Sequence, residues 1–279
     1  MEKEILGIEH LSVSFIQYGK GLTKRWLYAV EDLSLLVHAG EIVAVVGSSG
    51  SGKSLLAHAV MGLLPYNGRM EGKIWFDGEP LTQKRAAKLR GRELFLVPQN
   101  VSYLDPLMRV GEQVMGKRPS PSLRDTCRKV FAGYGLDAQV GEKYPFQLSG
   151  GMIRRILIST AVMGTPKLVI ADEPTPGLHP EAARRVMGHF KELAAAGAGV
   201  LLITHDLELA LMTADRVAVL YGGRMIEEAP ASVFTDETNL THAYTRALCR
   251  SMPKNWDADG ERLCDTGDIL LYMRKEYGR

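Results

Sequence analysis

The sequence predicts an α/β fold with a mainly parallel sheet core, an N-terminal antiparallel β layer and an inserted helical lobe. Short, wholly apolar runs recur along the chain, and segments with helical spacing lie between or after them. This pattern is typical of parallel strands covered on both faces by helices. The N-terminal segments instead mix apolar and polar positions, as antiparallel strands do. Residues from about 100 to 155 have helical patterns but no buried-strand run, which indicates a separate lobe.

The individual elements follow from these patterns. Residues 4–16, 26–37 and 72–77 are expected to form the antiparallel layer, with a turn at Asp77-Gly78. The apolar runs expected as parallel strands are 42–46, 167–171, 199–203 and 216–220. The helices are expected at 53–64, 152–163, 180–195 and 206–213.

The composition excludes several classes of protein. The chain has 279 residues, of which 46% are hydrophobic and 24% charged, so it is long enough for a large core and is not disordered. A formal net charge of +2 argues against binding nucleic acid through bulk positive charge. Three cysteines (Cys127, Cys249 and Cys264) cannot form a disulfide scaffold. No run approaches the roughly 18 apolar residues of a membrane helix, and the N-terminus does not resemble a secretory signal. We therefore expect a cytoplasmic protein whose only membrane role is peripheral.

Residues 47–54 form a phosphate-binding loop motif. They read Gly47, Ser48, Ser49, Gly50, Ser51, Gly52, Lys53 and Ser54, which fits G-x-x-x-x-G-K-[ST]. The motif lies between an apolar strand and a helical segment, which is the context that it requires. Glycines let successive N–H groups converge on phosphate oxygens, and the helix N-terminus adds its dipole. Lys53 would supply a mobile cation to the outer phosphates, and Ser54 a hydroxyl to Mg²⁺.

Two carboxylates end the apolar strand near residue 170. Asp172 and Glu173 follow Leu168-Val169-Ile170-Ala171, so they are expected at the carboxyl edge of the sheet beside the phosphate loop. Asp172 fits a Mg²⁺ position, and Glu173 fits a carboxylate that orients and polarises an attacking water. Solvated acids at a strand end would be the simpler interpretation of this pair if the loop motif were absent.

The segment from Leu148 to Arg155 points to a family. It reads Leu148-Ser149-Gly150-Gly151-Met152-Ile153-Arg154-Arg155, and the chain here resembles the nucleotide-binding subunit of an ABC transporter, whose signature is LSGG. The resemblance covers about residues 4–250 and leaves 251–279 as a C-terminal tail. It implies ATP and Mg²⁺ as cofactors. It also implies that Ser149, Gly150 and Gly151, at a helix N-terminus, contact the γ-phosphate of an ATP held by the opposite subunit.

The resemblance assigns three further residues. Gln99 matches the glutamine that touches Mg²⁺ and the attacking water and that senses the membrane partner. His205 matches the switch histidine that contacts the γ-phosphate. Phe15 is the candidate for the aromatic residue that stacks on adenine, although Tyr18 and Trp26 are alternatives in the same layer and core packing is another role for Phe15.

Several features are similar to the oligopeptide, dipeptide and nickel importer branch. They are Met152 in the signature, the stretch 103–114 and the sequence Tyr244-Thr245-Arg246-Ala247-Leu248. Oligopeptide members often carry a Cys/Pro-rich C-terminal motif, and this chain lacks it. That departure shifts the expectation towards a nickel or metallophore importer, with di- or oligopeptides as the alternative substrate.

The family resemblance also implies the partners. Two membrane permease subunits, a second ATPase subunit and, indirectly, an extracytoplasmic solute-binding protein are expected, with the chain peripheral at the cytoplasmic face of the membrane and no nucleic acid bound. His179 stands where the family commonly has aspartate, which is either tolerated variation or a sign that the second ATPase is a different chain. The alternatives are a soluble ABC ATPase that acts on DNA or ribosomes and a small-molecule kinase. Neither fits well, because the chain has one cassette and the kinase would not need LSGG.

Overall fold

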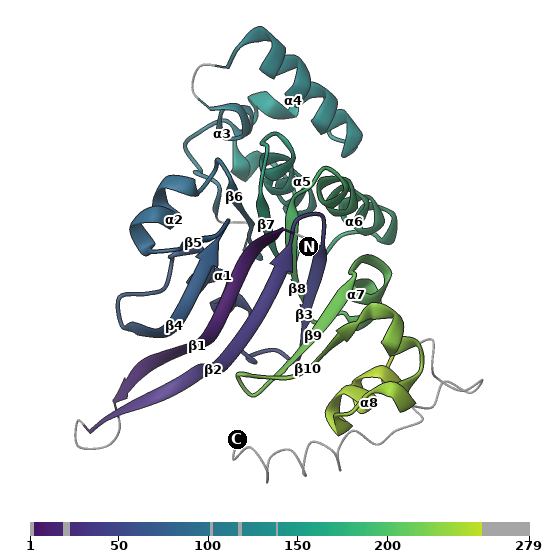
Figure 1. Cartoon of the computed structure of the whole chain (residues 1–279). Helices are drawn as coiled ribbons and strands as arrows, with labels where there is room; N and C mark the ends of the chain where they lie inside the picture. Colours follow the sequence, from purple (N-terminus) through teal and green to yellow (C-terminus); the bar gives the residue numbers. More distant parts are fainter. Residues whose placement is uncertain (1–2, 19–22, 101–102, 117–118, 138, 253–279) are drawn as a thin grey trace.

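The protein folds around two sheets, which stack with helices in a layered arrangement (Figure 1). A computed structural model describes residues 3–18, 23–100, 103–116, 119–137 and 139–252. The predicted tail 251–279 lies outside the described residues except for its first two, and so does Cys264.

The larger sheet has six strands in the order β10-β9-β3-β8-β7-β6. Its strands are β3 (Ile42–Val46), β6 (Leu94–Val97), β7 (Leu168–Asp172), β8 (Gly199–Thr204), β9 (Arg216–Tyr221) and β10 (Arg224–Pro230). All neighbouring pairs are parallel except β9 with β10, which closes one edge as an antiparallel pair. Every residue of β3, β7 and β8 is buried, as the wholly apolar runs predicted. The parallel core is therefore confirmed.

Different layers cover the two faces of this sheet. Val43 and Val45 of β3 pack with α1 (Lys53–Met61) and the N-terminal strands, whereas Ala44 and Val46 pack on the other side with α5 (Gly150–Val162), α6 (Pro180–Ala195) and α7 (Leu207–Thr213). The alternation of β3 between two clusters follows from the period of two in a strand. The phosphate loop therefore lies between two packed cores.

The second sheet is antiparallel and has the order β2-β1-β4-β5. Its strands are β1 (Glu4–Tyr18), β2 (Lys24–His38), β4 (Gly68–Phe76) and β5 (Glu79–Pro80). The expected antiparallel layer is confirmed, with registers such as Leu6 opposite Phe76. Asp77 and Gly78 both have positive φ (50° and 78°), as in a two-residue hairpin turn of the primed type.

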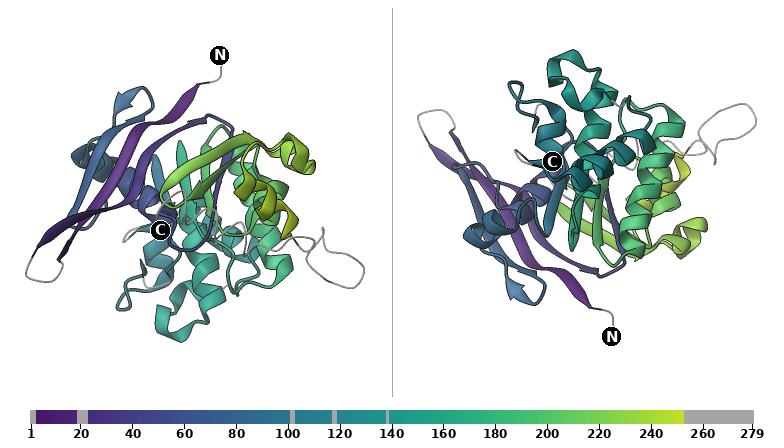
Figure 2. Two further views of the ribbon diagram at one scale, coloured as in Figure 1. Left: turned by 90° about the horizontal axis from the view of Figure 1, so that it is seen from below. Right: turned by 90° about the horizontal axis from the view of Figure 1, so that it is seen from above.

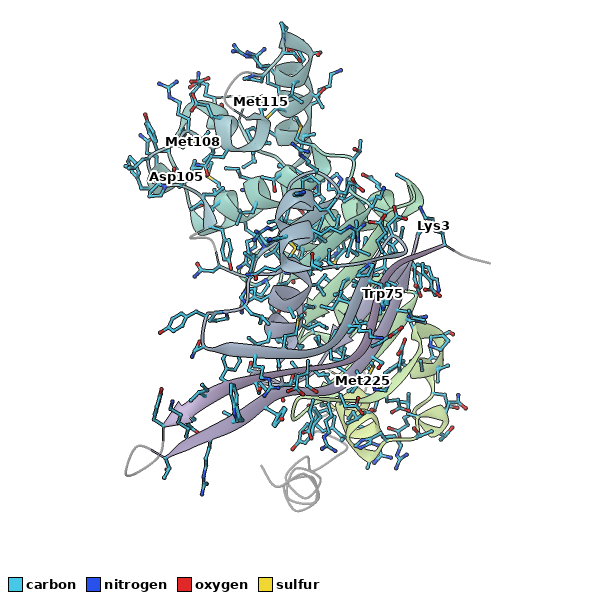
Figure 3. All side chains as sticks on the ribbon, turned by 60° about the vertical axis from the view of Figure 1, so that its left-hand side comes forward. Lys3, Trp75, Asp105, Met108, Met115 and Met225 are labelled. Carbon is cyan, nitrogen blue, oxygen red and sulfur yellow. The ribbon has the colours of Figure 1, made fainter. Side chains whose placement is uncertain are left out.

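A helical lobe follows β6 and projects away from both sheets (Figures 1 and 2). It contains α3 (Val110–Met115), α4 (Pro121–Gly133) and the short 3₁₀ turns Val140–Glu142 and Pro145–Gln147, and it leads into α5. Met108 and Met115 mark this lobe in Figure 3, well apart from Trp75 on β4. Cys127 is buried there as a free thiol.

Some elements differ from the sequence prediction. The helix expected at 53–64 ends at Met61, because Gly62 adopts the left-handed conformation (φ 65°) that stops it. The helix expected from 206 begins at Leu207, since Asp206 is its N-cap. The elements without a prediction of their own include β5, β10, α2 (Gln83–Leu89) and α8 (Ala243–Arg250). Their apolar patterns are short and mixed, so packing on the rest of the fold decides them.

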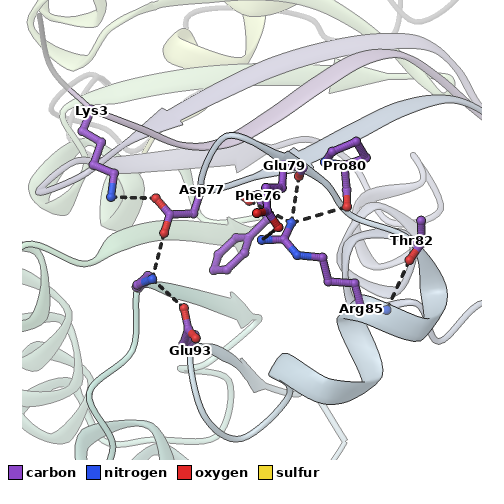
Figure 4. Close-up of polar contacts among 9 residues, drawn as sticks. Lys3, Phe76, Asp77, Glu79, Pro80, Thr82, Arg85 and Glu93 are labelled. Carbon is purple, nitrogen blue, oxygen red and sulfur yellow. Dashed lines mark hydrogen bonds and ion pairs between the residues drawn. The ribbon is translucent and has the colours of Figure 1, made fainter.

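Asp77 joins the antiparallel layer to the parallel core through ion pairs (Figure 4). Its carboxylate lies 2.6 Å from Lys3 Nζ and 2.8 Å from Lys167 Nζ, and Lys167 also lies 2.7 Å from Glu93. Because Lys167 precedes β7 and Glu93 precedes β6, the cluster connects the hairpin turn to the start of two core strands. Hydrogen bonds from Lys167 and Lys3 lower the pKa of Asp77 below its usual 3.8.

Asp77→Asn should destabilise the protein by about 1 kcal/mol at neutral pH, the upper range for a partly exposed ion pair. The pKa of Asp77 is lower in the folded state, so its stabilisation is complete above the unfolded pKa of 3.8 and is lost as pH falls through the folded value. The difference between wild type and Asp77→Asn should therefore shrink on acidification. Chemical denaturation at a series of pH values measures this, and a difference that persists at acid pH contradicts the argument.

Candidate functional site

The phosphate loop connects the end of β3 to the start of α1. Gly50 and Gly52 adopt positive φ (81° and 97°), a conformation that L residues rarely take. Gly52 is also tightly enclosed, because a Cβ there would lie 2.5 Å from the carbonyl oxygen of Ala29 on β2. The β layer thus presses against the loop and fixes its curl. The loop's N–H groups and the N-terminus of α1 together form a site suited to phosphate.

Lys53 is buried inside the loop. Its Nζ donates hydrogen bonds to the carbonyl oxygens of Gly47 (2.8 Å) and Ser48 (2.9 Å). Burial lowers the pKa of Lys53, while the nearby charges of Glu173 and Asp172 act in the opposite direction. The ammonium group is therefore held close to the loop and can exchange carbonyl contacts for phosphate oxygens.

Two hydroxyls of the phosphate loop, those of Ser51 and Ser54, are placed to contact a bound phosphate and a bound metal ion. The Ser51 Oγ is buried and has no hydrogen-bond partner among the residues that the structure describes. An unsatisfied hydroxyl at this depth is costly unless a ligand binds it, so it fits a phosphate. Ser54 Oγ donates to Asp172 Oδ1 across 3.2 Å. Burial raises the pKa of Asp172, and the charge of Glu173 adds to this. A divalent cation at the Ser54–Asp172 pair would offset that penalty, so these oxygen ligands fit Mg²⁺.

Glu173 and His205 meet at the same sheet edge. Both carboxylate oxygens of Glu173 lie 2.8 Å from His205 Nδ1. Glu173 comes directly after β7, and His205 directly after the adjacent strand β8. The Glu173 side chain is buried, whereas that of His205 is 59% exposed. The histidine thus holds the carboxylate from the solvent side.

Gln99 lies beside this pair. It follows β6, which is hydrogen-bonded to β7, so the loop after β6 starts next to Asp172. Gln99 itself is exposed. The parallel arrangement thus collects Gln99, Asp172, Glu173 and His205 at the carboxyl ends of three adjacent strands.

The signature segment lies at the surface. Ser149 caps α5, its Oγ accepting a hydrogen bond from the N–H of Met152 at 3.4 Å. Ser149 and Gly150 are exposed and Gly151 is half-buried. No hydrogen bond among the described residues joins these three to the phosphate loop of the same chain. The N-terminus of α5 is thus open to an external ligand or to another chain.

Phe15 lies on the face of the β layer that points to α1. It is half-buried and packs with the cluster that contains Val13, Val30 and α1. Tyr18 and Trp26 are 61% and 46% exposed. Trp26 pairs with Ile16, one residue along from Phe15, and therefore projects from the opposite face of the sheet. Of the three aromatics, Phe15 is the one on the side of the phosphate loop.

Two residues at the site have no predicted role in the sequence. Tyr244 of α8 lies beside Ser48 of the phosphate loop; burial raises the pKa of Tyr244, and Ser48 acts in the opposite direction. Arg154 is buried in α5 and reaches the loops that carry Gln99 and Glu173. The sequence signal for Arg154 is a charged residue facing inward on an otherwise apolar helix stripe. No sequence pattern predicts that Tyr244 lies at the phosphate loop, because only the tertiary fold brings α8 to that loop.

A phosphate loop between a buried strand and a helix, with carboxylates on a neighbouring parallel strand, defines a P-loop nucleotide-binding protein. The chain belongs to the ABC transporter family, because residues 30–176 match the family described as ABC transporter. No helix in the described part of the chain has the length and apolar character needed to cross a membrane.

Relatives of known role are similar over most of the chain. The oligopeptide transport ATP-binding protein OppD of Lactococcus lactis subsp. cremoris is 38% identical, over 100% of this chain and 85% of the relative. OppD of Escherichia coli is 35% identical (93% and 78% covered), and the dipeptide transport ATP-binding protein DppD of Escherichia coli is 36% identical (95% and 83%).

Solved structures confirm the fold. The ATP-binding subunit of an ABC transporter superposes with a TM-score of 0.69 at 26% identity, over 86% of this chain and 95% of the other. The cassette MJ0796, in a dimer bound to ADP and Pi, gives a TM-score of 0.71 at 24% identity, over 81% and 99%. The predicted α/β fold of the ABC type is therefore confirmed.

Proposed function

We propose that this chain is the ATP-binding and ATP-hydrolysing subunit that energises an ABC importer for dipeptides or oligopeptides. The observation that carries the proposal is the convergence of Lys53, Asp172 and the Glu173–His205 pair around one phosphate loop. The names of the relatives support the transport role and the peptide substrate. The expected preference for nickel or a metallophore has no support among the relatives named above.

Each residue of the site has a separate role in ATP binding or hydrolysis. The phosphate loop and Lys53 bind the phosphates of ATP, and Phe15 stacks on the adenine. Ser54, Asp172 and Gln99 hold Mg²⁺, which supplies charge neutralisation on the phosphates when bound. Glu173 accepts a proton from the attacking water and fixes its direction. His205 orients the Glu173 carboxylate through Nδ1 and leaves its exposed ring edge to contact the γ-phosphate.

The second half of each site comes from another chain. The exposed N-terminus of α5, with Ser149, Gly150 and Gly151, would bind the γ-phosphate of ATP held on the opposite subunit. ATP thereby joins two subunits head to tail, and hydrolysis releases them. The closing and opening then shift two permease subunits that dock near Gln99 and residues 100–115, of which 101 and 102 lie outside the described residues. The chain works at the cytoplasmic face of the membrane. A solute-binding protein delivers the peptide to the permease on the opposite face.

Gly151→Asp tests this arrangement. The aspartate would place a negative charge where the partner's γ-phosphate docks, and like charges repel strongly in a poorly solvated interface. ATP binding to the isolated chain should remain at the wild-type level while hydrolysis by the assembled transporter is lost. Equal loss of both would mean that the signature acts on the ATP of its own chain.

The partner ATPase is proposed to be a related but different subunit. His179 is exposed at the N-cap of α6 and makes no capping hydrogen bond there. In a symmetric pair two such histidines would face each other near the two-fold axis, and neither could supply the fixed carboxylate that an aspartate supplies there. Native mass spectrometry of the transporter purified through a tag on this chain should show one copy of it and one copy of a second ATPase. A fully active transporter with two copies of this chain would contradict the proposal.

A further inference from the structure

Arg154 joins two loops of the site through their main chains. Its guanidinium donates to the carbonyl oxygens of Glu173 (3.1 Å), Pro176 (2.7 Å) and Gln99 (2.8 Å). The residue is 9% exposed, so these bonds are largely shielded from water. One side chain on α5 therefore fixes the positions of the segments after β6 and after β7.

Each acceptor has a distinct place in the site. Gln99 and Glu173 carry two of the side chains proposed to act at the γ-phosphate. Pro176 belongs to the exposed loop before α6, which leads to His179 at the surface. Arg154 itself stands four residues after Gly150, the first residue of α5 and part of the signature. The guanidinium thus connects the signature helix to the main chain of Glu173 and of Gln99 by direct hydrogen bonds.

The backbone of Glu173 needs such support. Its φ is 48°, a left-handed conformation that is strained for a non-glycine residue. Its N–H donates to the carbonyl oxygen of Ile203 at 2.8 Å, and its own carbonyl accepts from Arg154. These two bonds hold the peptide groups on either side of the strained Cα. Loss of the Arg154 bond would let the residue relax and swing its carboxylate away from His205.

Burial of the charged guanidinium of Arg154 is unfavourable, and an apolar side chain could fill the same space without this desolvation. Burial lowers the pKa of Arg154, and the charge of Glu173 partly restores it. A buried guanidinium is retained where its five donors in a fixed fork are used, since a lysine has only one donor atom. The guanidinium of Arg154 uses its fork in this way, because it bonds three carbonyl oxygens on two separate loops.

We propose that Arg154 is a positioning residue: it holds Gln99 and Glu173 in register with the signature helix and so sets the rate of hydrolysis without touching nucleotide. The proposal deepens and rests on the proposed function, since it assigns Glu173 and Gln99 to the γ-phosphate. It implies that Arg154 acts on turnover and on the coupling between the Gln99 loop and Glu173. Nucleotide binding to the phosphate loop should not depend on it, because none of its hydrogen bonds reaches residues 47–54.

Arg85 on α2 offers a matched control outside the site. Its guanidinium also donates to three carbonyl oxygens, those of Phe76 (2.9 Å), Glu79 (2.8 Å) and Pro80 (3.4 Å) (Figure 4). These acceptors belong to β4 and β5 of the antiparallel sheet and not to the loops of Gln99 and Glu173. Loss of Arg85 therefore removes the same number of hydrogen bonds and tests the effect of local destabilisation.

The experiment compares Arg154→Met, Arg154→Lys and Arg85→Met in the transporter assembled with its permease, by kcat and KM for ATP, together with thermal unfolding of the isolated chain. Arg154→Met should lower kcat by about 10- to 100-fold with KM for ATP changed less than about twofold. Arg154→Lys should recover part of kcat, because an ammonium can reach one of the carbonyls. Arg85→Met should lower the unfolding temperature by about as much as Arg154→Met does, while its kcat falls less than about twofold.

Three results would overturn the inference. They are a wild-type kcat in Arg154→Met, a kcat loss of the same size in Arg85→Met, and a loss of kcat/KM in Arg154→Met that comes wholly from an increase in KM. Absence of permease-dependent ATP hydrolysis in the wild-type assembly would instead refute the proposed function. The two failures are therefore distinguishable within the same set of measurements.

Discussion

Glu173→Gln is expected to bind ATP as the wild type does and to hydrolyse it about 10²–10⁴-fold more slowly. The amide preserves the shape of the side chain and its contact with His205, which lies 2.8 Å away in the wild type. It removes the negative charge that polarises the attacking water. The variant should also accumulate with ATP as a closed pair of ATPase subunits, because the step that releases them is blocked.

The measurements are phosphate release by the assembled transporter and nucleotide affinity of the chain. Glu181→Gln makes the same chemical change on the exposed first turn of α6 and serves as the control, with wild-type turnover expected. Normal turnover of Glu173→Gln would reject Glu173 as the catalytic carboxylate and leave the contact with His205 without a role in hydrolysis.

Lys53→Ala should weaken ATP binding by at least about 100-fold. One hydrogen bond to a charged group is worth about 1.5–3 kcal/mol, and the ammonium also supplies charge to the phosphates. In addition, the substitution removes the bonds to Gly47 and Ser48 that hold the loop closed. Hydrolysis should fall at least as far, since it requires bound ATP.

Titration with a fluorescent ATP analogue measures this effect. Lys84→Ala, which removes an exposed lysine from α2, should bind the analogue with wild-type affinity. An unchanged affinity in Lys53→Ala would mean that the phosphates do not bind at this loop.

The parallel core was predictable because its strands carry no polar face. The run 42–46 could only be a strand covered on both sides, and it coincides with β3. The same logic located Asp172 and Glu173 at the carboxyl edge, since parallel strands end on one side of their sheet. The site's main residues were therefore predictable from local motifs and from the direction of the strands.

The remaining features depend on tertiary contacts that no local pattern encodes. The three bonds of Arg154 span up to 55 residues of sequence, so its place on an apolar helix stripe indicates burial but does not predict the carbonyls that it contacts. Tyr244 reaches Ser48 from the last described helix. The strained φ of Glu173 is likewise visible only in the folded chain, because glutamate has no intrinsic preference for it.

The most direct test of the central claim is ATP-dependent uptake of a labelled dipeptide into proteoliposomes. The vesicles would contain the permease, this chain and its partner ATPase, with the solute-binding protein on the side from which peptide enters. The account predicts uptake that requires ATP on the face carrying this chain and that is abolished by Glu173→Gln. Equal peptide uptake with and without ATP, or full uptake by the Glu173→Gln assembly, would contradict it.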